Sequence, residues 1–489
     1  MTHIVFVHTP MATVSVPERE AFWRSFDLRY HAAHPGLRHM KNVLWELPHW
    51  MTWLAGVLHE AGYTSMEAMD LYASECTMTG IDTERLARVV RATPGDVYLL
   101  SPMTPNLPFG LQIADLIKDI HPRSTVIVGG VVATPLHREI AAHRSIDYVV
   151  FGRGEQALPE LLKVIRKQGD LADMNNVSAR LPNGQIYTSK SQYPWVPVNK
   201  IPFPKIDLFS PDIGEDIRYL RQVYALGCPY QCSFCTIQTI GRKADYFSVD
   251  RVLDEIRGYR RQYGEHHNIY FGDETFTVHK ERTLAICDAL RDDGTIRYDI
   301  QTRPNCLGDD SVLRALKDSG CSWVEIGIET INQNSQDMHK QRMKLKELEE
   351  TLARLQDSGL TACSFLVNGF PDQSLDDMKR SIDYVCDLID RELLQASYIF
   401  GLVPYPGSQL FAEPERFGMR LLHRDFRYYH EELPPVYETA FAKPDDIYRM
   451  FLYGVEQLGA AMGQITTRLD TARLAEPSNY GGFWAGSHV

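Results

Sequence analysis

Three closely spaced cysteines, Cys228, Cys232 and Cys235, have the types and spacing of metal ligands. They follow the apolar run 221–226, so we expect them on a tight loop after a short strand. Three thiolates on one loop can bind three irons of a cubane 4Fe–4S cluster and leave the fourth iron open for chemistry. A structural zinc site would need a second cysteine pair or a nearby histidine, and residues 200–260 supply no second pair. The spacing therefore predicts a cluster rather than a zinc ion.

The composition is that of a globular protein of two or three domains, with 489 residues of which 44% are apolar. A formal charge of −12 argues against a nucleic-acid partner, which needs a basic face. No apolar run is long enough to span a membrane, and residues 1–10 do not have the pattern of a signal peptide. Nine cysteines, an odd number without a secretion signal, favour a reducing compartment, and we expect a cytoplasmic protein.

The first third of the chain alternates short apolar strands with helical patterns. Strands are expected at 3–7, 65–70, 97–101, 125–128 and 148–151, and helices at 48–61, 83–91, 109–120 and 136–143. This order predicts a doubly wound parallel sheet of the Rossmann-like type, in which ligands lie beyond the carboxyl ends of the strands. Residues 11–45 have no such pattern, and we expect an insertion that folds over a ligand or over the other domain.

The strand–helix pattern begins again at residue 219 and continues to residue 402. It contains about six units, too few for a full eight-unit barrel. Between the two regions, residues 166–215 are rich in Asn and Pro, and Leu181-Pro-Asn-Gly184 predicts a small hairpin. After the last unit, an aromatic and His-rich stretch precedes a helix near 445–462, which we expect to close the open side of the barrel.

The motif C-x-x-x-C-x-x-C, with the aromatic Phe234 before its last cysteine, resembles the signature of the radical S-adenosylmethionine (SAM) enzymes. The resemblance covers about 215–415 and implies a partial (β/α)6 barrel. It also implies that SAM binds the open iron, that reduction of the cluster yields a 5′-deoxyadenosyl radical, and that this radical removes hydrogen from the substrate. An electron donor of the flavodoxin or ferredoxin type is a further implication.

Later motifs resemble the SAM-binding strand ends of that family. Asp273 or Glu274, after the second strand, would receive the SAM ammonium group, although an acidic loop that caps a helix is the alternative. Arg303 would meet the SAM carboxylate or the substrate, with a structural ion pair as the alternative. Glu329 would bind the ribose hydroxyls, and the turn at Gly369 would meet the adenine.

Two residues are candidates for contact with the substrate. Tyr405 lies in a turn that resembles the one closing the last strand of the family barrel. Glu325 alternates outward on the strand that carries Glu329 and could serve the substrate. We expect these two side chains to take part in catalysis.

Residues 1–165 resemble the cobalamin-binding domain found ahead of many radical SAM cores. The stretch 47–63 looks most like the anaerobic magnesium-protoporphyrin ester cyclase branch. No D-x-H-x-x-G motif is present, so no histidine of that motif can be the lower cobalt ligand. The bulky Trp50 and Trp53 either cover the corrin or fill its place. The resemblance assigns cobalamin contacts to Thr104, Gly129, Gly130, Thr134, Gly152 and Glu155.

We therefore expect an α/β chain with four parts: a cobalamin-binding-type Rossmann-like domain at 1–165, a linker at 166–215, a radical SAM core at 216–415, and a small, mostly helical C-terminal region at 416–489. Its cofactors would be a 4Fe–4S cluster, SAM and cobalamin, and its reaction C-methylation of a small molecule. The alternative is cobalamin-free dehydration, deoxygenation, cyclisation or oxidation. A non-catalytic cobalamin sensor is opposed by the intact SAM motifs, and the sequence leaves the substrate open.

Overall fold

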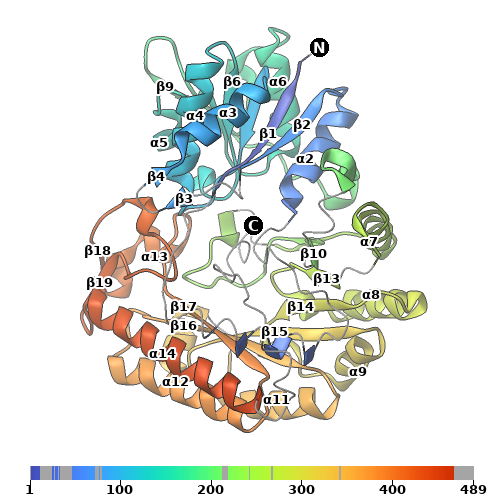
Figure 1. Cartoon of the computed structure of the whole chain (residues 1–489), viewed down its shortest axis with the longest axis vertical. Coiled ribbons are helices and arrows are strands. Elements are labelled where there is room, and N and C mark those ends of the chain that lie inside the picture. The colour runs from blue at the N-terminus through green and yellow to red at the C-terminus, as the bar shows by residue number, and fades with distance from the viewer. Residues whose placement is uncertain are drawn as a thin grey trace.

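The computed structural model describes residues 2–10, 47–71, 82–211, 219–239, 241, 243–265, 268–340 and 343–466, together with scattered residues between 22 and 33 and two short strands at 76–77 and 80–81. Most of the predicted insertion at 11–45, and the tail beyond 466, lie outside the described residues. Two α/β units are stacked on each other, with the N-terminal unit above the C-terminal one in Figure 1. Among the helices described, none is long and apolar enough to cross a membrane.

The N-terminal unit is built on one seven-stranded sheet with the order β2-β1-β5-β6-β7-β8-β9. Its strands are β1 Ile4–His8, β2 Met66–Asp70, β5 Val97–Leu100, β6 Thr125–Val128, β7 Tyr148–Val150, β8 Val177–Arg180 and β9 Ile186–Thr188. The first five are parallel, and the predicted hairpin adds β8 and β9 as antiparallel strands. The central strands are buried on both faces, as a doubly wound sheet requires.

Five helices accompany this sheet: α2 His49–Glu60, α3 Thr83–Ala92, α4 Leu107–Ile120, α5 Ala133–Ala141 and α6 Gly154–Ile165. Buried residues fall into two clusters, one on each side of the sheet. The cluster around Val5 and Tyr98 packs under α3, α4 and α5, and the one around Phe6 and Leu99 packs under α2 and α6. The prediction of a doubly wound Rossmann-like sheet is confirmed.

The C-terminal unit contains a six-stranded parallel sheet in simple sequential order. Its strands are β10 Tyr219–Gln222, β13 Asn268–Phe271, β14 Tyr298–Thr302, β15 Cys321–Glu329, β16 Ala362–Asn368 and β17 Ala396–Gly401. The helices α7 Val249–Tyr263, α8 Lys280–Asp293, α9 Asp310–Asp318, α11 Leu348–Asp357 and α12 Leu375–Asp390 alternate with them, and α14 Pro444–Thr466 packs beside α12. Six units in this order confirm the predicted partial barrel.

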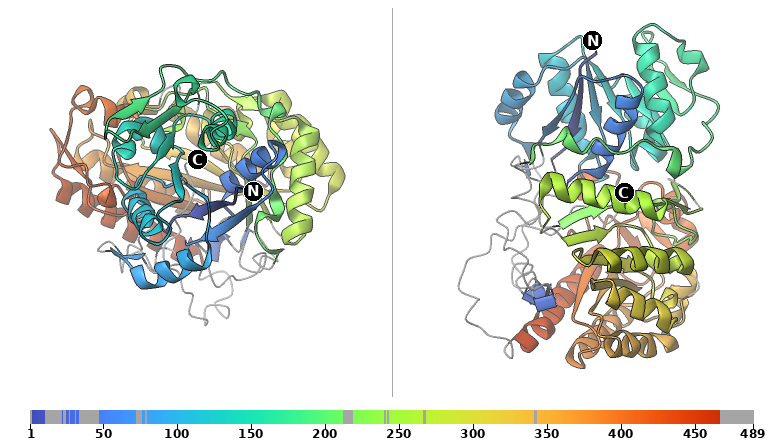
Figure 2. Two further views of the ribbon diagram at one scale, coloured as in Figure 1. Left: turned by 90° about the horizontal axis from the view of Figure 1, so that it is seen from above. Right: turned by 90° about the vertical axis from the view of Figure 1, so that its right-hand side faces the viewer.

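The described residues between 22 and 33 pack on the C-terminal unit, at the ends of its strands remote from the loops that carry the cysteines. Tyr30 Oη donates to Asp299 Oδ2 at 2.7 Å, near the start of β14. Arg29 Nε donates to the carbonyl of Met462 at 2.8 Å, in the last turn of α14, where cationic groups are favoured. Figure 2 shows these blue residues beside the red end of α14, far from the sheet that follows them in sequence. In its described part, the insertion therefore folds over the other domain.

Helix α2 connects the two units and sets the position of the tryptophans on its first turns. The hydroxyl groups of Thr52, on α2, and Tyr259, on α7, are 2.7 Å apart and share a hydrogen bond. On the next turn, a Cβ on Gly56 would lie 2.1 Å from the carbonyl oxygen of Phe203, so only glycine permits this contact. The helix is therefore fixed against both the 166–215 segment and the second unit.

We predict that Gly56→Ala lowers the thermal unfolding midpoint of the protein. Alanine would by itself stabilise a helix interior by about 1 kcal/mol relative to glycine. Here the added methyl collides with the backbone at Phe203, and such overpacking costs about 1–3 kcal/mol. Gly308→Ala is the matched control, because nothing lies within 4 Å of the added Cβ at that position. Equal midpoints for the two variants would contradict this account of α2.

Candidate functional site

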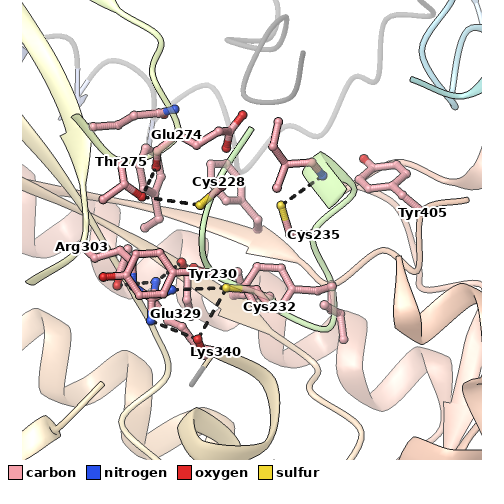
Figure 3. Close-up of a pocket in the computed structure, with 18 of the residues that line it drawn as sticks. Cys228, Tyr230, Cys232, Cys235, Glu274, Thr275, Arg303, Glu329, Lys340 and Tyr405 are labelled. Carbon is pink, nitrogen blue, oxygen red and sulfur yellow. Dashed lines mark hydrogen bonds and ion pairs between the residues drawn. The ribbon is translucent and has the colours of Figure 1, made fainter. Parts of the chain in front are cut away.

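A cavity lies at the carboxyl ends of the second sheet. We call it the cluster cavity, and its walls are Cys228, Tyr230, Cys232, Phe234, Cys235, Ile237, Glu274, Thr275, Gln301, Thr302, Arg303, Gly327, Glu329, Lys340, Phe365, Val367, Phe400, Gly401, Leu402, Val403, Tyr405 and Glu431. All three cysteines of the motif face it (Figure 3). Eight of the site residues predicted from the sequence meet there.

The cysteine loop begins with a glycine that no other residue could replace without strain. Gly227 has φ +86°, and a Cβ there would lie 2.7 Å from the carbonyl oxygen of Lys243 and 2.9 Å from that of Gly241. This close approach lets the amide of Cys228 donate to the Gly241 carbonyl at 3.3 Å. The first cysteine is thus bonded to Gly241, at the end of the loop. This bond fixes the separation between the two ends of the loop.

A buried relay of three polar side chains holds the middle of the loop. The amide of Ser233 donates to the carbonyl of His339 at 2.8 Å, and Ser233 Oγ lies 2.7 Å from His339 Nδ1. On the other side of the ring, Nε2 lies 3.1 Å from Asp372 Oδ1. Because the carboxylate can only accept, Nε2 carries the proton and Nδ1 accepts from the serine hydroxyl. His339 belongs to a π-helix, Gln336–Lys340, an irregular turn that is frequent at functional sites.

The thiols lie beside a guanidinium group and an aromatic ring. Arg303 Nη1 donates to Cys232 Sγ at 3.3 Å, and its guanidinium lies 3.9 Å from the centre of the Tyr230 ring. Burial raises the pKa of Cys228 to about 11 and that of Cys235 well above its usual value. The binding of iron would therefore have to release these protons. Among the described residues, no three His, Cys, Asp or Glu side chains are arranged to hold a single metal ion.

Acidic and basic side chains alternate around the same cavity. Burial raises the pKa of Glu274 to about 7, against the lowering effect of Arg221. Glu329 accepts from Lys340 Nζ at 2.6 Å and has φ +63°, an uncommon conformation for a residue with a side chain. Arg303 Nη2 also donates to the carbonyl of Lys340 at 3.0 Å. Such strain is found at ligand-binding positions, and here it directs the Glu329 carboxylate into the cavity.

Three predicted site residues lie outside the walls of the cluster cavity. Asp273 is fully buried in an ion pair with Arg282, at 2.8 Å, and accepts from the amide of Tyr224 at 2.6 Å. Its carboxylate is thus committed to the packing of α8, and Glu274 is the acid that reaches the cavity. Gly369 has φ +102°, and its carbonyl accepts from Tyr437 Oη at 2.6 Å.

Glu325, the third of these residues, lies inside the barrel. Its carboxyl accepts from Tyr270 Oη at 2.5 Å, and burial raises its pKa to about 7. The pairing of β15 with β16 shifts register between Gly327 and Glu329, and Glu329 lines the cluster cavity whereas Glu325 does not. Both glutamates lie on β15, as the sequence predicted, but only Glu329 reaches the cavity.

A second cavity lies at the carboxyl ends of the first sheet. We call it the interdomain cavity, and its walls include His8, Thr9, His49, Trp50, Trp53, Ser101, Pro102, Met103, Asn106, Gly129, Gly130, Thr134, Gly152, Arg153 and Glu155 from the first unit and Arg221, Val223 and Leu226 from the second. Five of the six predicted cobalamin contacts lie there. Thr104 is buried outside the walls, where its neighbours Met103 and Asn106 reach the cavity instead.

The chemistry of this cavity fits a large ligand with polar side groups. Gly130 has φ +91°, and a Cβ there would lie 2.3 Å from Ser101 Oγ, so the strand-end turn stays open. Thr134 Oγ1 donates to the carbonyl of Gly130 at 3.1 Å and accepts from the amide of Gly152 at 2.9 Å, which ties two such turns together. Among the wall residues, Trp53 Nε1, Asn106 Oδ1 and Arg153 Nη1 are buried polar atoms with no hydrogen-bond partner in the described part of the chain. Trp50 and Trp53 line this space and leave it open.

Family models match both units. The model of the radical SAM superfamily matches residues 223–385, and that of the B12-binding domain matches residues 46–162. The chain is a radical SAM enzyme. Its N-terminal unit is a B12-binding domain, and the cofactors that these two domains bring to the enzyme are a 4Fe–4S cluster, SAM and cobalamin.

Known proteins resemble the enzyme over most of its length. The anaerobic magnesium-protoporphyrin IX monomethyl ester cyclase of Rubrivivax gelatinosus is 23% identical over 81% of this chain and 70% of its own length. An uncharacterized methyltransferase of Pyrococcus horikoshii is 25% identical over 74% of this chain and 77% of its own length. The radical SAM methyltransferase TsrM of Kitasatospora setae, solved with cobalamin and a [4Fe-4S] cluster, superposes with a TM-score of 0.64 at 15% identity, over 92% of this chain and 82% of its own. The last comparison shows the shared fold.

Sequence reasoning missed four residues that shape the cluster cavity. His339, Lys340 and Asp372 lie outside every motif that the resemblance supplied, and Glu431 falls in a stretch noted only for its aromatic and histidine content. Each acts through a partner at least 11 positions away, such as Glu329 for Lys340. No local sequence pattern predicts such contacts, because the partner residues become neighbours only in the folded protein.

We predict that His339→Ala reduces the iron content of the purified enzyme and shortens the lifetime of its cluster in air. The substitution removes the acceptor for the Ser233 hydroxyl and leaves Asp372 without its histidine contact. An unsatisfied buried polar group costs about 1–3 kcal/mol, which would loosen the cysteine loop. His59→Ala, at an exposed position of α2, is the control. Iron content and air stability equal to those of the control would show that the relay does not position the loop.

Proposed function

We propose that the enzyme methylates a carbon atom of a small-molecule substrate in a cobalamin-dependent radical reaction. When bound, the cluster and SAM supply the 5′-deoxyadenosyl radical that removes a substrate hydrogen, and cobalamin supplies the methyl group. Support comes from the pair of domains and from methyltransferases among the relatives. The residues of the chain bind, orient and enclose these groups.

The observation that carries the proposal is the closeness of the two cavities along the chain. Leu226 lines the interdomain cavity, and Cys228 lines the cluster cavity. Only Gly227 separates them, so one short loop borders both spaces. Arg221 lines the interdomain cavity while its charge acts on Glu274, in the cluster cavity. A cobalamin in the first space would therefore lie next to the site of radical formation, as methyl transfer to a substrate radical requires.

We propose that Cys228, Cys232 and Cys235 hold the cluster. The guanidinium of Arg303 donates a hydrogen bond to Cys232 Sγ and so helps to orient this ligand. Beside them, Glu274 would accept the ammonium group of SAM. A buried carboxyl whose pKa is about 7 gains most from a cation placed next to it.

On the opposite wall, Glu329 would bind the ribose hydroxyls through the carboxylate that Lys340 keeps in place. Phe234 lines the same cavity and offers an apolar face to the adenosine. The turn at Gly369 lies outside the walls, so we propose for it only an indirect part in shaping the adenine end. Glu325 would likewise act from inside the barrel, through Tyr270.

We propose an electron donor of the flavodoxin or ferredoxin type. Pro229 and Gln231, between the first two cysteines, are exposed. An electron donor that docks there would be separated from the cluster only by the cysteine loop.

We predict that transfer of a labelled methyl group requires cobalamin. The enzyme is reconstituted under anaerobic conditions, reduced, supplied with SAM carrying a trideuterated methyl group, and assayed with and without cobalamin. Methyl transfer should appear as labelled methylcobalamin in its absorbance and mass spectra, because a cobalamin in the interdomain cavity would lie next to SAM. Release of 5′-deoxyadenosine without any labelled methylcobalamin would favour cobalamin-free dehydration, deoxygenation or cyclisation instead.

We predict that Cys232→Ala abolishes the cluster and all cleavage of SAM to 5′-deoxyadenosine. Two thiolates cannot hold the three irons that need protein ligands. Cys386→Ala is the matched control, because Cys386 lies on α12, far from the cluster cavity in sequence and outside its walls. The variants are compared by iron and sulfide content and by chromatography of the nucleoside product. Cleavage retained in Cys232→Ala would refute the assignment of the cluster ligands.

A further inference from the structure

The wall of the cluster cavity has two parts of different character. One part is polar and includes Arg303, Glu329 and Lys340. The other part comes from β16, β17 and the chain after β17, and consists of Phe365, Val367, Phe400, Gly401, Leu402, Val403, Tyr405 and Glu431. Figure 3 shows Tyr405 across the cysteine loop from Arg303 and Lys340. We call this second part the apolar end of the cavity.

A single acid, Glu431, lies in the apolar end. Burial raises the pKa of Glu431, and the Tyr405 hydroxyl is its side-chain hydrogen-bond partner. Burial and the neighbouring carboxyl raise the pKa of Tyr405 well above its usual value, so this hydroxyl keeps its proton and can donate it to the acid. Glu431 as a residue is only half-buried, and it lines the cavity.

The backbone holds this acid rigidly at the end of the last strand. The amide of Gly401 donates to the carbonyl of Glu431 at 2.8 Å. A Cβ on Gly401 would lie only 2.8 Å from the same oxygen, so glycine at this position allows the two chains to touch. On the next residue the Leu402 side chain is buried. The position of Glu431 is therefore fixed by the fold and does not depend on a flexible surface loop.

The charged groups around Glu431 stabilise its carboxylate only weakly. His430 favours the charged form, whereas the neighbouring Glu432 opposes it, and burial outweighs both. None of the wall residues of the apolar end, from Phe365 to Glu431, is a lysine or an arginine. A carboxylate enclosed in this way gains strongly from a cation brought by a ligand.

Two aromatic rings complete the apolar end. Phe365 and Phe400 stack with ring centroids 5.9 Å apart and an interplanar angle of 28°. Both rings line the cavity and offer apolar surface to a ligand there.

We propose that the apolar end binds a substrate that carries a protonated amine on an apolar body. The ammonium group would lie against Glu431 and the Tyr405 hydroxyl, and the apolar part against Phe365 and Phe400. A substrate that presents a carboxylate here would be repelled by Glu431, and a neutral alcohol would gain only a hydrogen bond. This inference rests on the proposed function, in so far as that function makes the apolar end the substrate site.

The test compares three probes of one shape: 3-phenylpropylamine, 3-phenylpropan-1-ol and 3-phenylpropanoate. Their binding to the reconstituted, SAM-loaded enzyme is measured by anaerobic calorimetry at neutral pH. We expect the amine to bind about tenfold tighter than the alcohol, and the carboxylate to bind no more tightly than the alcohol. Equal affinities for amine and alcohol, or tighter binding of the carboxylate, would overturn the proposal.

Variants assign the selectivity to the acid. Glu431→Gln should reduce the preference for the amine to about twofold or less, because the amide keeps the shape and removes the charge. Tyr405→Phe should keep the preference and weaken the binding of the amine, since it removes one hydrogen bond. Glu413→Gln, at an exposed position, is the matched control and should behave like the native enzyme. If Glu431→Gln retained the full preference for the amine, another group would be responsible for recognising the ammonium charge.

The failure of this inference can be told apart from the failure of the proposed function. Labelled methylcobalamin forms from SAM and cobalamin without the probes, so its formation tests methyl transfer alone. If methylcobalamin forms and the amine is not preferred, the substrate class is wrong and the function stands. If the amine is preferred and no methylcobalamin forms, the amine site stands and methyl transfer fails.

Discussion

The contact between Ser233 and His339 is the constraint on which the site depends. A loop that carries three thiols has no regular backbone hydrogen bonds, so its shape must come from partners elsewhere in the chain. The Ser233 amide and hydroxyl both reach His339, at 2.8 Å and 2.7 Å, and Asp372 orients the imidazole from the other side. Because His339 is fully buried, water does not compete for these hydrogen bonds, and the low dielectric of the interior strengthens them. The loop is thus held from the side opposite the cavity, and its thiols remain available to the cluster.

The same loop also joins the two domains in function. It begins at Gly227, directly after a residue of the interdomain cavity, and its first cysteine enters the cluster cavity. Helix α2 is clamped to the second unit through Thr52 and Tyr259 and presents Trp50 and Trp53 to the space between the domains. The relative position of the two cavities is therefore set by packing, which is the condition for two cofactors to act on one substrate carbon.

Much of the fold could be predicted from the sequence, because strand and helix periods repeat regularly in both domains. The cysteines, Glu329 and the Gly129-Gly130 turn could be placed because strand ends in parallel sheets share one edge. The choice between Asp273 and Glu274 could not be made. The two residues are adjacent in sequence. Arg282, nine residues after Asp273, forms an ion pair with Asp273, and this contact decides which of the two carboxylates is buried away from the cavity. Glu431 could not be assigned either, since its role depends on the approach of its backbone to Gly401.

The account makes one central claim: that the cluster and cobalamin are held side by side across Gly227. Electron paramagnetic resonance of the enzyme loaded with cob(II)alamin and reduced cluster tests this claim most directly. We expect the two paramagnetic centres to interact, which would broaden and split the cob(II)alamin signal relative to the signal in Cys232→Ala, which lacks the cluster. Two superimposed signals with no interaction between them would contradict the claim.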